Sequence, residues 1–325
     1  MNKVVIAGKE YKKTNVFDYY WLFAKKRQDL FFNRIESPQG PWTDDEILKK
    51  YRFTNAYRAS DRVSQYLINS VLGDEHSRSV EDVFFRVLIF KIFNKISTWE
   101  ALENKFGDIS ISSFSREEYS NFLSNRMLSG SKNYSAAYIM PSGKSSFGYP
   151  QKHENNLALI ELMLSDSVPI KIADSLTMES VYRILLSYPS IGPFLAYQYV
   201  IDLNYSSITS FSENDFVVAG PGAIDGISKC FLGVKKKSYV DVIKYMVDHQ
   251  DQNFSRLGLD FRDLWGRPLH LIDCQNIFCE LSKYSRISHP HIAGASGRTR
   301  IKQRYIADHS QIEYRYPSSW GLRTV

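Results

Sequence analysis

Apolar residues recur every three or four positions through most of the chain, which is the spacing of amphipathic α-helices. This pattern predicts helices at residues 17–32, 80–96, 99–106, 117–127, 155–164, 176–187, 194–203, 240–249, 261–265 and 271–284, and a further helix that begins near residue 43. It also predicts a turn at residues 218–223 that starts a helix through Asp225, Ile227 and Phe231. A short apolar run at residues 4–7 is consistent with a strand or an arm. Because strands and helices do not alternate and no repeat is present, the predicted fold class is mainly α.

One predicted helix stops and a second begins within residues 181–203. Pro193 suits the first turn of the second helix, because a backbone N–H there has no intrahelical partner to lose. A helix-hairpin-helix of this kind exposes backbone N–H groups at a helix N-terminus, which favours a phosphate ligand. We therefore expect DNA contacts from the turn residues Ser190, Ile191 and Gly192.

Two groups of polar residues interrupt the apolar pattern. On a helix, side chains three or four residues apart would share one face, as do Arg52, Asn55, Arg58, Asp61, Arg62 and Gln65. Such a face is either a buried hydrogen-bonded network or a ligand surface. We expect contacts to a base or its modification from Asn55, Arg58, Asp61 and Arg62 in this group, and from Asp273, Gln275 and Asn276, beside Glu280, in the predicted helix 271–284.

A polar loop after the hairpin brings Asn214 and Asp215 just before an apolar run. A carboxylate placed against a deoxyribose stabilises the positive charge that builds as an N-glycosidic bond breaks, and it can activate water. We expect Asp215 to be catalytic and Asn214 to contact the base. The alternative is that Asp215 caps the following helix. Asp225 is a secondary acid.

The net charge of +6 and the isoelectric point near 9.0 favour a nucleic acid partner. Residues 286–325 hold seven Arg or Lys against two acids. Gly, Ser and Thr interleave with these cations, so we expect phosphate contacts from Arg298, Arg300, Lys302 and Arg304, with a solvated basic face as the alternative. The expected domains are an arm and helix at 1–41, a helical core at 42–285 that contains the 181–203 hairpin, and a basic tail at 286–325.

Several classes of protein are disfavoured. Three cysteines cannot form a disulfide framework or a four-cysteine iron–sulfur cluster, and His289 and His291 lack metal-ligand spacing to other candidates, so we expect no metal and no cofactor. No run approaches the roughly 18 apolar residues of a membrane span. The first residues lack a signal-peptide core. We expect a cytoplasmic monomer that binds no membrane.

The hairpin resembles that of the DNA glycosylase superfamily, whose turn is commonly Leu-Pro-Gly-(Ile/Val)-Gly followed by a catalytic Asp. Pro189, Ile191 and Gly192 fit, whereas Tyr188 and Ser190 replace the Leu and the first Gly. Asp215 follows Gly192 by 23 residues, close to the position of the catalytic acid in that superfamily. Lyase-type members carry a nucleophilic Lys at the start of the second helix. Here Pro-Phe-Leu-Ala occupies that place, so the resemblance implies a monofunctional glycosylase that leaves an abasic site.

A longer resemblance covers residues 42 to 305. It is carried in order by WTDDEILKKYRFTNAYRASDRVSQYL, RVLIFKIFNKISTWE, IGPFLAYQYVIDLNYS, FSENDFVVAGPGAIDGISKCF, LIDCQNIFCELSKYSRISHP and SGRTRIKQRY. These segments resemble the alpha-glutamyl/putrescinyl thymine pyrophosphorylases, also called the helical domain of 5-hydroxymethyluracil DNA kinases. The resemblance implies a helix-hairpin-helix glycosylase-like fold, with two helical lobes and a DNA-binding cleft. The P-loop of the associated kinase is missing, so we expect a free-standing helical enzyme acting on double-stranded DNA with modified pyrimidines.

The resemblance leaves three functions open. The leading hypothesis is a DNA glycosylase that flips out and excises hypermodified pyrimidines, such as glucosylated 5-hydroxymethyl pyrimidines, from phage DNA in anti-phage defence. The alternative is an amino acid:DNA transferase, in which an amine displaces pyrophosphate from pyrophosphorylated 5-hydroxymethyluracil. For that chemistry Arg52, Arg58, Arg62 and Lys229 would hold the pyrophosphate, and Asp61 or Asp273 would hold the amine. The third hypothesis is a non-catalytic DNA-binding module.

Overall fold

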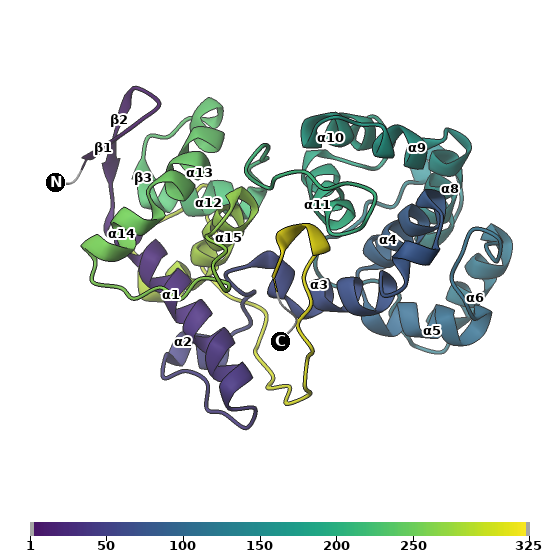
Figure 1. Ribbon diagram of the computed structural model, residues 1–325, viewed down its shortest axis with the longest axis horizontal. Coiled ribbons are helices and arrows are strands. Elements are labelled where there is room, and N and C mark those ends of the chain that lie inside the picture. Colours follow the sequence, from purple (N-terminus) through teal and green to yellow (C-terminus); the bar gives the residue numbers. More distant parts are fainter. Residues whose placement is uncertain (1–2, 323–325) are drawn as a thin grey trace. The chain divides into compact units, whose positions relative to one another are not determined.

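The computed structural model describes residues 3–322 and divides the chain into two compact units (Figure 1). Unit 1 contains the described residues up to Asp61 together with Phe216–Ile312. Unit 2 contains Arg62–Asp215 together with the described residues from Glu313 onward. Arg323, one of the seven cations of the basic tail, lies outside the described residues. The fold is mainly α, as the sequence predicts.

Unit 1 combines a small antiparallel sheet with a group of helices. The sheet order is β1-β2-β3, with Lys3 opposite Lys12 and Lys13 opposite Phe231. The strands are β1 (Lys3–Ile6), β2 (Lys9–Lys13) and β3 (Phe231–Leu232), and the helices are α1 (Asn15–Glu36), α2 (Glu46–Lys50), η1 (Arg58–Ser60), α12 (Pro221–Cys230), η4 (Lys236–Ser238), α13 (Tyr239–Asp248), α14 (Gln250–Arg256) and α15 (Leu271–Ser288). The core forms where α1, α12 and α13 pack against α15.

Helices α12 and α15 approach each other closely because two glycines of α12 face α15. A Cβ placed on Gly226 would lie 2.1 Å from the carbonyl oxygen of Phe278, and one on Gly222 would lie 2.2 Å from Sγ of Cys279. Any larger side chain at either position would push the helices apart. This contact fixes α15, the helix that carries the polar residues of the candidate site.

Unit 2 is built on α4, which is buried on every side after its first turn and packs against α8, α9 and α11. Ser79 caps its first turn by accepting a hydrogen bond from the N–H of Asp82, and Asn94 ends it in the left-handed conformation. The elements are α3 (Arg62–Tyr66), η2 (Leu67–Val71), η3 (Glu75–Ser77), α4 (Val80–Phe93), α5 (Ile96–Phe106), α6 (Arg116–Leu128), α7 (Lys144–Phe147), α8 (Lys152–Ser165), α9 (Val168–Ala173), α10 (Met178–Leu186), α11 (Pro193–Asn204) and η5 (Ser318–Trp320).

Two predicted elements are wrong. Residues 261–265 do not form a helix; Leu264 instead pairs with Arg267 in an isolated bridge. Residues 52–61 do not present one helical face, because they form a loop that ends in the single 3₁₀ turn η1, and α3 begins only at Arg62. In both segments the backbone bonds side chains that are distant in the sequence, Asp273 at Arg58 and Tyr57 at Leu264 and Arg267, and a local apolar period cannot show such bonds.

Candidate functional site

The loop 54–61 is held in unit 1 by one polar stripe of α15. Asp273, Asn276 and Glu280 follow one another at intervals of three and four residues, so they lie on one side of the helix. Because α15 is otherwise packed against apolar neighbours, this stripe is largely buried, and its polar atoms need partners. The partners are backbone and side-chain atoms of the loop.

Each residue of the stripe binds a different part of the loop. The Asp273 carboxylate accepts hydrogen bonds from the N–H of Arg58 at 3.0 Å and from the N–H of His270 at 3.1 Å. Asn276 donates from Nδ2 to Oγ1 of Thr54 and to the carbonyl of Asn55, both at 3.1 Å. Glu280 accepts from the N–H of Thr54 at 2.9 Å. The loop is therefore fixed at three points before any ligand binds.

A buried arginine from α1 completes this arrangement. Arg27 donates from Nε to the Thr54 carbonyl at 2.7 Å and from Nη2 to Oδ1 of Asn55 at 3.0 Å. Within the loop, Oδ1 of Asp61 accepts from the N–H of Asn55 at 2.7 Å, and Asn55 donates back to the Ser60 carbonyl. The sequence interpretation missed Arg27. Its signal is an arginine inside the aromatic-rich helix at 17–32, where a cation needs a buried partner.

The loop and its clamp carry two acids whose pKa values rise on folding. Burial raises the pKa of Asp61 to about 7, against the opposing hydrogen bond from the Asn55 N–H. Burial also raises the pKa of Asp273 to about 6, although Arg267, Arg58 and the two N–H donors favour its charged form. Burial lowers the pKa of neighbouring His270 to about 4. Two acids with raised pKa values near each other are typical of functional sites, so the loop and the α15 stripe together are the candidate site.

Sequence-predicted site residues of unit 1 are only partly brought together. Asn55, Arg58 and Asp61 lie in the clamped loop 54–61, and Asp273 and Asn276 lie in the α15 stripe that holds it. Gln275 points to the other side of α15 and accepts from the N–H of Gly220, the N-cap of α12. Arg52 is exposed. Among the described residues, no group of three or more His, Cys, Asp or Glu side chains is arranged to hold a metal ion.

A second buried polar cluster holds the start of the basic tail. Asp225 accepts from the N–H of Ser296 at 2.6 Å and from the hydroxyl of Ser282, and Ser228 accepts from the N–H of Ala295. Burial works to raise the pKa of Asp225, but these hydrogen bonds outweigh it and the pKa is lowered. The Nζ of Lys229 donates hydrogen bonds to the Ser282 carbonyl and to the Ser285 hydroxyl, so its ammonium group is held inside unit 1.

The tail then runs across unit 1 with its cations exposed. The N–H of Arg52 donates to the carbonyl of Gln303, and the N–H of Tyr305 donates to the carbonyl of Lys50. The guanidinium of Arg304 lies over the ring of Tyr51 at 4.9 Å. The side chains of this extended segment are open to solvent at Arg298, Arg300, Lys302 and Arg304.

In unit 2, the predicted hairpin joins α10 to α11. The N–H of Ile191 donates to the carbonyl of Tyr188, and Gly192 is the N-cap that precedes Pro193. Ser190 has a φ of 66°, a left-handed conformation that glycine adopts more readily. This explains why the related turn has glycine where Ser190 stands. Ile191 is buried, whereas Ser190 is partly exposed and Gly192 is exposed.

Asn214 and Asp215 lie in an exposed turn of unit 2. Buried Asn204, at the end of α11, accepts from the N–H of Phe211 and donates to its carbonyl, which fixes the path of this loop. The N–H of Asp215 donates to the Ser212 carbonyl at 3.1 Å. Helix α12 is capped by Gly220, so Asp215 does not cap it.

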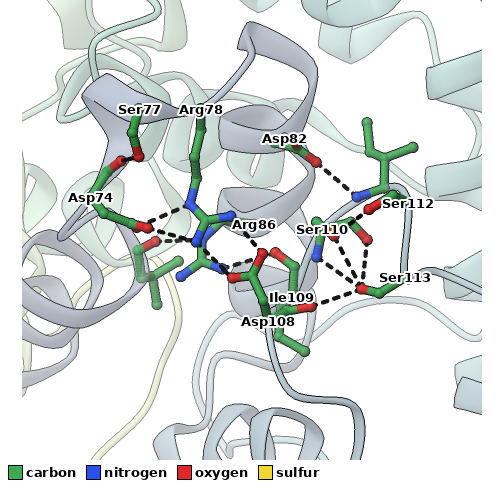
Figure 2. A network of polar contacts seen from close by, with 12 residues as sticks. Asp74, Ser77, Arg78, Asp82, Arg86, Asp108, Ile109, Ser110, Ser112 and Ser113 are labelled. Carbon is green, nitrogen blue, oxygen red and sulfur yellow. Dashed lines mark hydrogen bonds and ion pairs between the residues drawn. The ribbon is translucent and has the colours of Figure 1, made fainter.

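A separate ionic network of unit 2 ties the segment before α4 to the loop after α5 (Figure 2). Asp108 accepts from Arg78 at 2.6 Å and from Arg86 at 3.3 Å, and Arg78 also pairs with Asp74. Arg86 is buried and donates to the carbonyls of Val71 and Ile109. Because both arginines are satisfied by protein oxygens, we assign this network to stability.

Comparison with known proteins assigns the chain to a family. The model of the helical domain of 5-hmdU DNA kinase matches residues 14–294, and the chain belongs to this family. A similar protein is the 5-hmdU DNA kinase of Bacillus phage SP10, which is 26% identical over 286 residues. That alignment covers 83% of this chain and 45% of the phage protein, so the chain spans less than half of its relative. No solved structure matches. No helix among the described residues is long and apolar enough to cross a membrane.

Proposed function

We propose that this protein is an enzyme of DNA hypermodification that acts on a 5-hydroxymethyluracil-derived base in duplex DNA. The reaction is the transfer of an amine to the base with displacement of pyrophosphate. Family membership supports this function over base excision, because the relative acts by its name on 5-hydroxymethyluracil-containing DNA and is a modifying enzyme. The comparisons therefore favour the alternative hypothesis of the sequence analysis over the glycosylase.

The observation that carries the proposal is the clamped loop 54–61. This loop carries Arg58 and Asp61. Its backbone is held in place by hydrogen bonds to Asp273, Asn276 and Glu280 of α15. A transferase needs a cation for pyrophosphate and an acid for the amine, both pre-positioned. Arg58, which is buried, and Asp61, which is half-buried, lie three residues apart in this loop, and we assign the pyrophosphate to the first and the amine to the second.

Binding to the DNA is assigned to two features. The exposed cations from Arg298 to Arg304 contact phosphates of the duplex, since they stand on an extended segment with no acid among them. The N-terminus of α11, preceded by the turn at residues 190–192, contacts a further phosphate in the manner of a helix-hairpin-helix of a glycosylase-like fold.

The test uses duplex DNA that carries pyrophosphorylated 5-hydroxymethyluracil. Incubation with an added amine is expected to release pyrophosphate and to yield an amine-substituted base, detected by mass spectrometry of the nucleosides. Pyrophosphate release must depend on the amine. Free base and alkali-labile sites in the absence of any amine would instead establish the glycosylase, and Asp215→Asn would then identify its catalytic acid. Unchanged DNA under both conditions would leave a DNA-binding module.

A further inference from the structure

The proposed reaction needs a base before carbon–nitrogen bond formation can begin. An aliphatic amine has a conjugate-acid pKa of about 10, so at neutral pH its nitrogen holds a proton and has no free electron pair. A nearby carboxylate that accepts this proton makes the amine nucleophilic. The carboxylates around the clamped loop are the candidates for accepting this proton.

The two polar clusters of unit 1 contain four carboxylates. Three of them, those of Asp273, Glu280 and Asp225, already bind protein groups that hold the structure. Both oxygens of Asp273 accept backbone N–H groups, and the residue is 1% exposed. Glu280 accepts from the Thr54 N–H and pairs with Lys283 at 2.8 Å. Asp225 is bonded to Ser282 and to the Ser296 N–H. A proton on Asp273 or Asp225 would break a hydrogen bond that holds the structure, and a proton on Glu280 would weaken its ion pair with Lys283.

Asp61 is different. Among the described residues its carboxylate makes one hydrogen bond, from the Asn55 N–H to Oδ1. Its side chain is half-buried, and Oδ2 makes no hydrogen bond among the described residues, so this oxygen is the one that can accept a proton. The loop cannot swing away, because Asn55 is also bonded to Arg27 and to Asn276.

The charges around Asp61 suit a base that works near neutrality. Burial raises its pKa to about 7, and Glu280 of α15 adds to this rise. Arg27 of α1 and Arg58 of the loop oppose it, as does the Asn55 N–H. A general base functions best when its pKa lies close to the working pH.

We infer that Asp61 is the catalytic residue that accepts the proton of the incoming amine, an inference that rests on the proposed function. The Asp61 carboxylate takes one proton from the ammonium group. The freed electron pair on nitrogen then forms a bond to the methylene carbon attached to the base. The bond from that carbon to the pyrophosphate oxygen breaks, and its electron pair leaves with pyrophosphate. The protonated Asp61 afterwards returns its proton to water.

Asp61→Asn tests this role, because the Asn side chain keeps an oxygen for the Asn55 N–H but cannot accept a proton. Two nucleophiles are compared on pyrophosphorylated DNA at pH 7.5: ethylamine, which is protonated there, and hydroxylamine, which is neutral. With ethylamine we expect kcat to fall about 10²- to 10⁴-fold. With hydroxylamine we expect the variant to stay within a few-fold of the unmodified protein, because no proton has to be removed first.

Asp44→Asn provides the matched control, since Asp44 is an exposed acid of the same unit. It should leave both reactions unchanged. Equal losses of Asp61→Asn with both nucleophiles would overturn the inference and assign Asp61 to binding, and no loss with ethylamine would overturn it as well. If the unmodified protein releases no pyrophosphate with either nucleophile, the proposed function itself fails, an outcome distinct from both.

Discussion

At the scale of single residues, buried carboxylates in this protein mainly hold backbone. Asp273 satisfies two N–H groups that come from different parts of unit 1, those of Arg58 and His270. An unsatisfied buried N–H costs about 1–3 kcal/mol, so one side chain here removes two such costs. Asp273 therefore positions the candidate site without needing to touch a substrate.

Replacing Asp273 by Asn should destabilise the protein by roughly 1–3 kcal/mol. The amide has one acceptor oxygen, so its NH₂ group must face one of the two N–H donors. Urea denaturation followed by circular dichroism measures the destabilisation. The control is Asp251→Asn, an exposed acid on α14 that should change little. A variant as stable as the unmodified protein would show that the two hydrogen bonds do not hold the loop.

Asp61→Asn should flatten the dependence of stability on pH between pH 4 and 7. The pKa of Asp61 is about 7 when folded and about 3.9 when unfolded, so in this range the folded state binds more protons. Stability from this group is complete below pH 4 and is lost as the pH rises through 7. The variant should gain at most about 2 kcal/mol relative to the unmodified protein across this range, after allowance for solvent screening. Urea unfolding at several pH values measures the slope, and parallel curves would contradict the raised pKa.

The sequence could identify these residues but not their arrangement. The spacing of Asn55, Arg58 and Asp61 mimics a helical face, yet the segment is a loop. What decides its path is the stripe on α15, more than 200 residues away, together with Arg27. Local spacing contains no information about such long-range hydrogen bonds. The sequence indicates that polar groups in apolar surroundings need partners, but it does not indicate which partners they find; the roles predicted for these residues stay predictions.

At the scale of elements, long amphipathic helices were predictable and short segments were not. Helices α1, α4, α8, α11 and α15 follow the apolar period closely because each buries one face or all faces. The two-residue strand β3 has no pattern of its own and exists because it pairs with β2. Likewise Gly222 and Gly226 weaken the prediction of a helix at α12, because glycine is a poor helix former. In the structure they allow α12 and α15 to pack closely.

Gly226→Ala should weaken the contact between α12 and α15. The added Cβ would lie 2.1 Å from the Phe278 carbonyl oxygen, which belongs to backbone and cannot rotate away. Overpacking of this kind typically costs about 1–3 kcal/mol. Thermal unfolding measures it, with Gly222→Ala as a milder comparison, since the clash there is with the Cys279 side chain. Equal stability of Gly226→Ala and the unmodified protein would show that the helices can separate freely.

At the scale of the whole molecule, the chain has a net charge of +6, and residues 286–325 hold seven Arg or Lys against two acids. In this tail, Arg298, Arg300 and Lys302 follow one another at intervals of two residues on an exposed segment without helix. Phosphates follow one another at regular intervals along each strand of a duplex, so successive cations of one segment are suited to neutralise several of them.

Replacing Arg298, Arg300 and Lys302 together by Ala should weaken binding to any duplex and reduce its salt dependence. The slope of log Kd against log salt should fall by about 0.9 for each phosphate that the protein no longer neutralises. Fluorescence anisotropy at several salt concentrations measures this slope. The matched control removes the same charge from the exposed lysines Lys235, Lys236 and Lys237. An equal change in both variants would mean that the tail has no special role in binding DNA.

The order of segments along the chain has a consequence for how the protein forms during synthesis. Unit 1 needs Phe216–Ile312, which emerges from the ribosome after nearly all of unit 2, and unit 2 is completed by residues beyond Ile312. Buried Gln65 needs that last segment for two of its hydrogen bonds. Its Nε2 donates to the carbonyl of Arg315 and its Oε1 accepts from the N–H of Arg315, both at 2.9 Å. Unit 1 is therefore complete once Ile312 has emerged, whereas unit 2 still lacks its last segment, and a nascent chain arrested before residue 313 would leave Gln65 without these partners.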